Sequence, residues 1–349
     1  MRRTLQIPAL VVITGIAFGL VDMTAQQIAV NELADTAQVV RMSPALDAVV
    51  ARDVRIERVA KGFVFTEGPM WHEGALWFSD LQGNKMYTLS ADGRLQLKLD
   101  KAGGLDSFAP GTYGGSNAMV ADRDGTVLMM QHGLRRIVRL DGTLVTPFLT
   151  GLEGRPFNSP NDLAFSPDGS LYFTDPPYGL FNPATPNADL DKDPRRAIPF
   201  NGVYRYKDGK LTAVITDLTR PNGLAFSPDG KVLYVANSEN PSAYYRYDVK
   251  PDGGLGTRQL FADLTKETGS GVPDGVKVDS HGNVWASGQG GIRIYSPKGE
   301  LLGQVKLPEV AANIAWGGPG GSTAYFTAST SIYRLPLRVS GHLSPYHRK

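Results

Sequence analysis

Short runs in which apolar and polar residues alternate recur along most of the chain, as in KMYTLS at 85–90, GVYRYK at 202–207 and AYYRYD at 243–248. Alternation with a period of two is typical of β-strands that bury one face. The runs end at turns rich in Gly, Asp or Pro, and the 349 residues include 40 Gly and 24 Pro. Because so many tight connections suit short strands better than helices, the pattern predicts an all-β protein.

One phrase of the sequence occurs twice, as SPNDLAFSPDG at 159–169 and as RPNGLAFSPDG at 220–230. Four other segments follow the same order: an oxygen-bearing residue, a short apolar run, a turn and a second apolar strand. The oxygen-bearing residues, called the ring residues below, are Glu67, Asn117, Asn161, Asn222, Asp274 and Asn313. They are spaced about 40 to 60 residues apart, which indicates six copies of one structural unit.

Each unit has room for about four antiparallel strands, which is the size of one blade of a β-propeller. We therefore expect a six-bladed β-propeller over residues 52–340, in which residues 52–60 add the outer strand of the last blade and close the ring. Residues 26–51 are interpreted as a weakly structured lead-in with a short helix near 43–53, and 341–349 as a C-terminal tail. A solenoid of stacked β units is the alternative.

The first 25 residues have the features of a signal peptide: MRR, an apolar stretch at 7–20, and a polar region with small residues. We expect cleavage after Ala25 and a periplasmic or secreted protein with no membrane contact after cleavage. An uncleaved anchor is the alternative, although the stretch is shorter than the ~20 residues of a typical span. The chain has no cysteine, so an oxidising compartment poses no difficulty for folding.

The charge of the chain gives no reason to expect a nucleic-acid partner. Its 36 basic and 34 acidic residues leave a formal net charge of +2, whereas nucleic-acid-binding proteins usually carry a concentrated basic face. A small molecule is the expected partner.

The six ring residues predict a metal site. In a propeller, equivalent positions of the innermost strands surround the channel, so these oxygen atoms are expected to face a common centre. Two carboxylates balance the charge of Ca²⁺ and asparagine carbonyls add neutral ligands. Zinc prefers His or Cys, and neither His72 nor His132 occupies a ring position. The alternative is that these residues only begin strands, as the aspartates of the SPDG segments form turns.

Four motifs carry a resemblance to a known family: FTEGPMW, SPNDLAFSPDGSLYFTDPPYGL, RPNGLAFSPDGKVLYVANS and VPDGVKVDSHGNVWAS. The sequence resembles the gluconolactonase family, also called the SMP-30 or luciferin-regenerating family, over about residues 52–337, and DPPYGL is similar to its bacterial branch. The resemblance implies a divalent metal, usually Ca²⁺, in the channel of a six-bladed propeller that hydrolyses sugar lactones. The ligands that it implies are Glu67, Asn161, Asn222 and Asp274, and it implies a substrate-side position for Asn117.

A lactonase mechanism follows from this expectation. The metal polarises the lactone carbonyl, and a carboxylate beside it activates water. Asp274 is the candidate base and Glu67 the alternative. Zn²⁺, Mn²⁺ and Mg²⁺ can also occupy an oxygen site, and either a monomer or a dimer fits the sequence.

Substrate contacts are expected from two segments near the channel mouth. The step from Asn161 to Asn222 is the longest between ring residues, and its excess forms a Pro-rich insertion after Asp175. The candidates there and in QHGLRR are Asp175, Tyr178, Arg195 or Arg196, His132 and Arg135. The alternative is a solvated loop with charged residues and a packed histidine.

Two other functions remain open at this point. One is a broader hydrolase of esters or organophosphates, and the other is a binding protein whose calcium only locks the blades together. Since fold alone does not determine function, the ring residues carry the argument for an enzyme.

Overall fold

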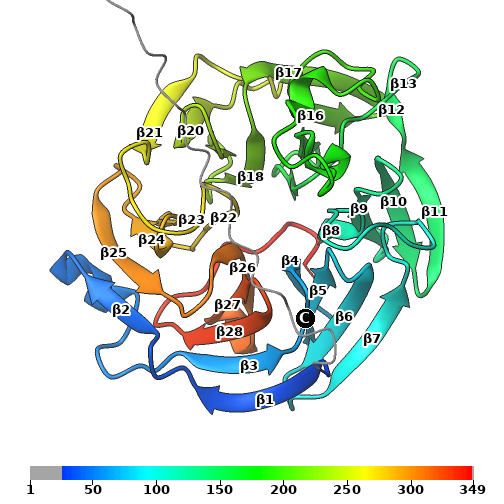
Figure 1. The fold of residues 1–349 in the computed structure, drawn as a ribbon. Coiled ribbons are helices and arrows are strands. Elements are labelled where there is room, and N and C mark those ends of the chain that lie inside the picture. Colours follow the sequence, from blue (N-terminus) through cyan, green and yellow to red (C-terminus); the bar gives the residue numbers. More distant parts are fainter. Residues whose placement is uncertain (1–25, 348–349) are drawn as a thin grey trace, which may run out of the picture.

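The computed structural model describes residues 26–347, which form a ring of antiparallel β-sheets, the blades, around a central channel (Figure 1). The prediction of an all-β six-bladed propeller is confirmed. The predicted signal peptide and its cleavage site lie outside the described residues. Within residues 26–347, no helix is long and apolar enough to cross a membrane.

Blades 1 to 4 each consist of four strands that follow one another in sequence, with the first strand innermost. Blade 1 contains β4 (Thr66–His72), β5 (Ala75–Asp80), β6 (Lys85–Ser90) and β7 (Leu95–Asp100), and blade 2 contains β8 (Ser116–Ala121), β9 (Val127–Gln131), β10 (Arg136–Asp141) and β11 (Leu144–Leu149). Blade 3 contains β14 (Leu163–Phe165), β15 (Leu171–Asp175), β16 (Asn201–Lys207) and β17 (Lys210–Leu218), and blade 4 contains β18 (Pro221–Phe226), β19 (Val232–Asn237), β20 (Ala243–Asp248) and β21 (Gln259–Asp263).

Blades 5 and 6 each have five strands because the N-terminal segment adds to both. Blade 5 contains β22 (Val276–Val278), β23 (Val284–Gly288), β24 (Gly291–Tyr295), β25 (Leu301–Lys306) and, outermost, β2 (Gln38–Arg41). Blade 6 contains β26 (Ala311–Gly317), β27 (Thr323–Ala328), β28 (Ser331–Pro336), β3 (Glu57–Lys61) and, outermost, β1 (Ile28–Leu33). The strand expected at 52–60 therefore closes the ring as β3, whereas the lead-in at 26–51 is more ordered than expected.

The remaining elements are short. A hairpin of β12 (Gly151–Leu152) and β13 (Arg155–Pro156) follows blade 2, and the 3₁₀ turns are η1 (Pro44–Ala48), η2 (Tyr178–Leu180), η3 (Leu190–Lys192) and η4 (Pro319–Gly321). The helix expected near 43–53 is η1, which is capped by the Ser43 side chain. Both η2 and η3 lie in the Pro-rich insertion of blade 3.

The hydrophobic core lies between neighbouring blades. Trp285 of blade 5 and Trp316 of blade 6 meet edge to face with ring centroids 5.3 Å apart, and one core cluster joins residues of both blades. Similarly, Phe157 and Phe173 pack with Tyr204 in blade 3 against residues of blade 2. Burying such a side chain stabilises the fold by about 2–3 kcal/mol, so the alternating residues of the strands hold the blades together.

Glycines next to the ring residues let the inner strands approach closely at the channel. A Cβ atom on Gly68 would lie 2.3 Å from the backbone oxygen of Asn117, and one on Gly223 would lie 2.3 Å from that of Asp274. The backbone nitrogen of Gly223 also donates to the Asp274 oxygen at 3.1 Å. Any larger residue would push the inner strands apart, so these glycines set the width of the channel.

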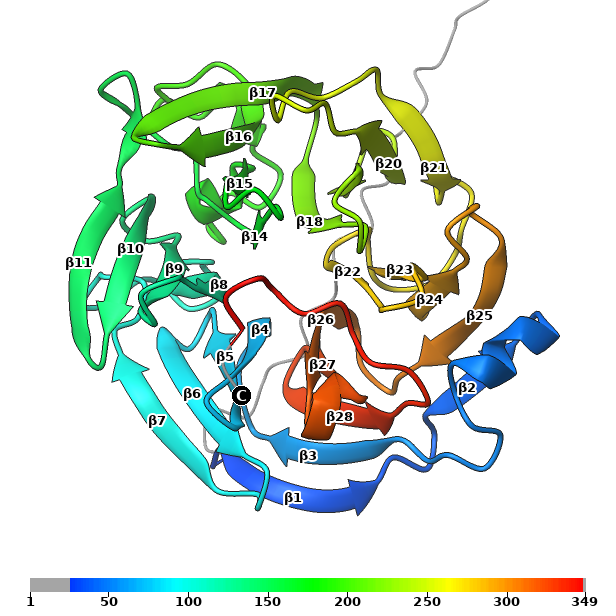
Figure 2. The ribbon, with the colours of Figure 1, turned by 180° about the vertical axis from the view of Figure 1, so that it is seen from behind.

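Residues 341–347, called the C-terminal strap, run across the middle of the ring (Figure 2). The backbone nitrogen of His342 donates to Val278 of blade 5 at 2.9 Å. Farther along, the Tyr346 ring contacts Phe165 of blade 3 with centroids 4.8 Å apart. The segment interpreted as a tail is thus packed against the channel.

Candidate metal and active site

The structure brings the ring residues to one level of the channel, at or just before the start of each inner strand. Glu67, Asn117, Asn222 and Asn313 lie in β4, β8, β18 and β26, while Asn161 and Asp274 precede β14 and β22. All six are buried or nearly so. Backbone hydrogen bonds between neighbouring blades hold these residues at the same level. For example, the backbone nitrogen of Ala118 in blade 2 donates to the backbone oxygen of Asn161 at 3.2 Å.

Glu67, which is buried, and Asp274, which is partly exposed, carry carboxyl groups whose charges interact. Burial raises the pKa of Glu67 to about 7, and the nearby charge of Asp162 adds to the effect. Burial also raises the pKa of Asp274 well above its ordinary value, and the charges of Glu67 and Asp162 raise it further. Two ionised carboxylates so close together lower the stability of the fold unless a cation compensates their charge. This position is therefore suitable for a bound cation.

Buried asparagine oxygens without partners complete the candidate site. The Asn222 Nδ2 atom donates to Ser238 Oγ at 3.1 Å, while Asn222 Oδ1 is buried with no hydrogen-bond partner. Asn117 Oδ1 is buried and unpartnered in the same way. An unsatisfied buried carbonyl oxygen needs an explanation, and a hard divalent cation accepts such oxygens together with carboxylates. The residues present therefore fit a calcium-type site.

No group of three His, Cys, Asp or Glu side chains with metal-binding geometry occurs in residues 26–347. The candidate ligand set differs from such a group because two of its four members, Asn161 and Asn222, are amides. His72 lies at the far end of β4 beside Trp77, away from the ring level. The site thus offers oxygen atoms only.

The sixth ring residue, Asn313, supports the site through hydrogen bonds. Its Nδ2 atom donates to Glu67 Oε2 at 3.2 Å, and its Oδ1 atom accepts from Lys277 Nζ at 3.3 Å. Because both ends of the amide are occupied, Asn313 differs from Asn222, whose oxygen has no partner.

Sequence reasoning missed two charged residues of the channel. Asp162 is buried and its Oδ2 atom lies 3.2 Å from Lys277 Nζ. Asp162 directly follows Asn161, and Lys277 follows Asp274 by three residues, so both are displaced from the ring positions along the inner strands. A search for charged residues at apolar strand positions could have found them.

Aromatic and imidazole groups surround the site at the channel mouth. His132 Nε2 lies 3.3 Å from Asn117 Nδ2, and burial lowers the pKa of His132 to about 4. Burial raises the pKa of the Tyr178 phenol, with a further contribution from the Asp274 charge. Burial also raises the pKa of Tyr113 to about 12, and Asp274 contributes again. Tyr113 was missed, although it stands in the Gly-rich segment just before Asn117.

Other predicted substrate residues have structural contacts. Asp175 accepts hydrogen bonds from the backbone nitrogens of Asn158 at 2.9 Å and Ser159 at 2.7 Å. Arg135 donates to the backbone oxygens of Phe157 at 2.7 Å and Asn158 at 3.0 Å. These contacts favour loop-positioning roles, and the substrate roles of both residues stay predictions.

The arginines of the insertion are also engaged within the protein. Arg195 pairs with Asp193 at 2.6 Å, and Arg196 pairs with Asp191 at 2.7 Å while its side chain is 6% exposed. Arg196 also donates to Asn158 Oδ1 at 3.3 Å and to Asn201 Oδ1 at 3.0 Å, so these contacts hold the insertion against blade 3, and the substrate roles of both arginines stay predictions.

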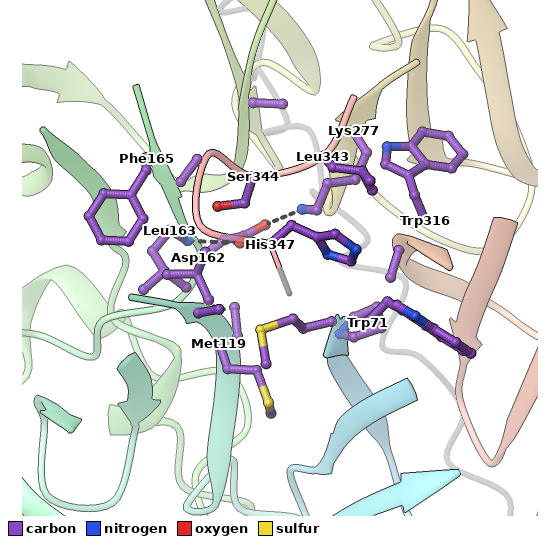
Figure 3. Close-up of a pocket in the computed structure, with 18 of the residues that line it drawn as sticks. Trp71, Met119, Asp162, Leu163, Phe165, Lys277, Trp316, Leu343, Ser344 and His347 are labelled. Carbon is purple, nitrogen blue, oxygen red and sulfur yellow. Dashed lines mark hydrogen bonds and ion pairs between the residues drawn. The ribbon is translucent and has the colours of Figure 1, made fainter. Parts of the chain in front are cut away.

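A cavity of about 130 Å³ lies in the channel between the ring level and the C-terminal strap (Figure 3). Its walls are mostly apolar, with Trp71, Met119, Phe165 and Trp316 among the lining residues. The strap residues His342, Leu343 and Ser344 line one end of this cavity.

A family model described as the SMP-30/gluconolactonase/LRE-like region matches residues 65–330. The chain belongs to this family. A gluconolactonase from Zymomonas mobilis subsp. mobilis is 35% identical to this family member over 317 residues, which cover 87% of each chain.

Solved structures agree with this assignment. A gluconolactonase from Xanthomonas campestris matches with a TM-score of 0.76 and 30% identity, covering 89% of this chain and 98% of the other. The calcium-binding protein regucalcin from Agrobacterium tumefaciens matches with a TM-score of 0.62 over 82% of this chain and 95% of the other. Its 20% identity supports the fold alone. The gluconolactonase relatives confirm the prediction of a family of enzymes that hydrolyse carboxylic esters.

Proposed function

We propose that this protein is a calcium-dependent lactonase that hydrolyses sugar lactones such as gluconolactone. The observation that carries the proposal is the carboxyl pair Glu67 and Asp274, beside the unpartnered Oδ1 atom of Asn222. Carboxylates and a free amide oxygen in one channel favour a hard cation, and the gluconolactonase relatives supply the reaction class.

The proposed metal ligands are Glu67, Asn161, Asn222 and Asp274. A divalent cation bound there supplies a Lewis acid for the lactone carbonyl. Asp274 is already held for this task, since its backbone nitrogen donates to Tyr244 Oη and Ser287 Oγ, each at 3.2 Å. Ser238 adds a link by accepting from Asn222 and donating to the Pro273 oxygen at 2.7 Å.

In the proposed reaction, the Asp274 carboxylate accepts a proton from the attacking water as the water oxygen bonds to the carbonyl carbon. The ring C–O bond then breaks, and the proton passes to the departing ring oxygen, which gives an open-chain hydroxy acid. Glu67 is the alternative base.

The residues at the mouth provide the proposed substrate contacts. The phenols of Tyr113 and Tyr178 stay protonated because burial raises the pKa of each, so they can donate to substrate hydroxyls. His132 is neutral at neutral pH because burial lowers its pKa, and it orients Asn117 from behind. We also propose that the protein acts in the periplasm or outside the cell, after removal of residues 1–25.

The test is proton release from D-glucono-1,5-lactone by the mature chain, corrected for spontaneous hydrolysis. Activity should vanish with EDTA and return with Ca²⁺. Asp274→Asn and Glu67→Gln should each lower kcat by at least about a hundredfold. Asp229→Asn, which changes an exposed carboxylate in an SPDG turn, should leave activity unchanged.

Calcium binding, measured by isothermal titration calorimetry, separates ligand from base. A variant that binds Ca²⁺ normally but does not turn over has lost the base. Calcium binding by the wild type without turnover of aldonolactones would instead favour a broader esterase, an organophosphate hydrolase or a binding role. If the wild type bound no divalent ion, the proposal would be wrong.

A further inference from the structure

A second layer of polar side chains lies next to the ring level on the side of the C-terminal strap. It consists of Asp162 from blade 3 and Lys277 from blade 5, and the ring residue Asn313 of blade 6 connects it to the ring level. Lys277 Nζ lies 3.2 Å from Asp162 Oδ2 and 3.3 Å from Asn313 Oδ1. Figure 3 shows Lys277 reaching across the channel toward Asp162. The layer therefore ties three blades together directly behind the candidate metal site.

This layer is connected to the candidate ligands. Asn313 Nδ2 donates to Glu67 Oε2 at 3.2 Å and lies 3.5 Å from Asp162 Oδ2. The charge of Lys277 also acts on both Glu67 and Asp274. Lys277 thus reaches one ligand through a hydrogen-bonded amide and both carboxylate ligands through its electric field.

The charges of these residues have a simple relation to a dication. Glu67, Asp162 and Asp274 contribute three negative charges when ionised, and Lys277 contributes one positive charge. The four side chains together carry a charge of −2, which one divalent ion neutralises. Electroneutrality matters here because Glu67 and Asp162 are 3% and 2% exposed, and unbalanced charge is costly in such surroundings.

We propose that Lys277 is a fixed internal cation that sets the charge of the channel to −2 and thereby determines the preference of the site for divalent ions. This inference rests on the proposed metal-dependent function. The charge of Lys277 balances that of Asp162. Lys277 also orients the Asn313 amide, which in turn holds the Glu67 carboxylate in place. Lys277 is therefore a specificity-determining and positioning residue, not a ligand.

A purely structural role for Lys277 makes a different prediction. If the ammonium group only held Asp162 in place, its removal would lower the affinity for all ions by the same factor. If it sets the charge, its removal leaves −3 and favours trivalent over divalent ions, whereas removal of the Asp162 charge leaves −1 and has the opposite effect. Removing both restores −2.

The experiment measures the affinities of the full mature chain for Ca²⁺, by calorimetry, and for Tb³⁺, by sensitised luminescence. Lys277→Met should raise the ratio of Tb³⁺ to Ca²⁺ affinity on the order of tenfold, and Asp162→Asn should lower it by a similar factor. The double variant should return to within about threefold of wild type, since its formal charge is again −2.

Two further variants serve as controls. Lys277→Arg keeps the charge and should keep the ratio, while Lys298→Met removes an exposed lysine of blade 5 and should change nothing. The thermal midpoint of each metal-free variant shows whether it folds. If Lys277→Met does not fold, the comparison of Lys277→Arg with Asp162→Asn still tests the proposal.

The inference would be overturned if Lys277→Met lost affinity for Ca²⁺ and Tb³⁺ equally. It would also be overturned if the double variant failed to recover the wild-type ratio of the two affinities. The measurements do not depend on turnover, so they separate it from the proposed function. If the wild type binds Ca²⁺ and the ratios do not move, only the role of Lys277 is wrong. If the wild type binds no divalent ion, the proposed function fails, and the inference fails with it.

Discussion

The side-chain amide of Asn313 donates to the Glu67 carboxylate at 3.2 Å, which joins the innermost strand of the last blade to that of the first. The residue at the sixth ring position thus holds a candidate ligand in place across the junction that closes the ring. We expect Asn313→Ala to weaken Ca²⁺ binding by about 1–2 kcal/mol, because the carboxylate loses its donor and Lys277 loses an acceptor. Calorimetric titration with Ca²⁺ measures this, and Asn31→Ala, an exposed amide in β1, is the control. Unchanged affinity in Asn313→Ala would contradict the supporting role.

The close approach of the inner strands predicts a large effect at Gly223. A Cβ atom there would lie 2.3 Å from the Asp274 backbone oxygen and 2.8 Å from Gly275 Cα. Gly223→Ala should therefore destabilise the protein by about 3 kcal/mol and weaken Ca²⁺ binding, since the backbone of Asp274 must move. Gly209→Ala, at a turn glycine whose Cβ would meet nothing within 4 Å, should cost only about 1 kcal/mol from its positive φ. Denaturant titration of both variants gives the comparison, and equal losses would rule out the steric argument.

The buried imidazole of His132 predicts a pH-dependent stability. Burial lowers its pKa to about 4 from the ordinary value of 6.5. In the unfolded chain the imidazole takes up a proton near pH 6.5, whereas the folded protein resists this until about pH 4. The free energy of unfolding should therefore fall by up to about 3 kcal/mol as the pH drops through this window.

His132→Gln should remove that part of the slope, whatever its effect on stability at neutral pH. Denaturant titrations at several pH values between 4 and 7 measure it. His281→Gln, at an exposed histidine, should retain the wild-type slope, and a variant slope equal to that of wild type would mean that His132 is charged in the folded protein.

Asp175 offers a test between a structural and a substrate-binding role. Because its carboxylate accepts two buried backbone N–H groups, Asp175→Ala should lower the free energy of unfolding by about 2–4 kcal/mol. KM for the lactone should then change little at temperatures where the variant is folded. A KM raised more than tenfold with an unchanged thermal midpoint would restore the substrate role.

The C-terminal strap predicts an effect of truncation. A chain that stops after Ser340 loses the contacts of Leu343 and Tyr346 at the channel and should be less stable by about 3 kcal/mol. Tyr346→Ala should give part of this loss, since it removes the ring that contacts Phe165. Thermal melts of the three proteins test the prediction, and a truncated chain as stable as the full one would show that the strap packs weakly.

The repeated order of polar residue, apolar run and turn was sufficient to predict the blades and the ring level, because each inner strand carries its polar residue at the same position. The outer strands β1 and β2 were missed for a physical reason. Their segments, IAVNEL and QVVR, are short and only partly buried. β2 pairs with β25 near the other end of the chain, and β1 pairs with β3, which itself joins the distant strand β28. The pattern of residues within a short segment does not indicate a pairing partner that is distant in the sequence.

The site was predictable only where chemistry coincided with the repeat. Asp162 was hidden because it adjoins Asn161 in SPND and resembles part of a turn. Tyr113 lies in an irregular loop that has no period, so its position depends on ring contacts with Phe65 and Phe181. Asp175 presents the opposite difficulty, since the sequence does not show the backbone N–H groups that donate to its carboxylate, and its substrate role stays a prediction.

The placement of β1, β2 and β3 has a consequence for the order of events during folding. Blades 5 and 6 draw edge strands from residues 28–61 and their remaining strands from residues 276–336. Neither blade can be completed until nearly the whole chain is available, so ring closure is expected to be the late and slow event. The same topology delays the reverse process, since opening the ring requires edge strands on two blades to detach. A long lifetime of the closed form against proteases would follow from this arrangement, independently of how favourable the equilibrium is.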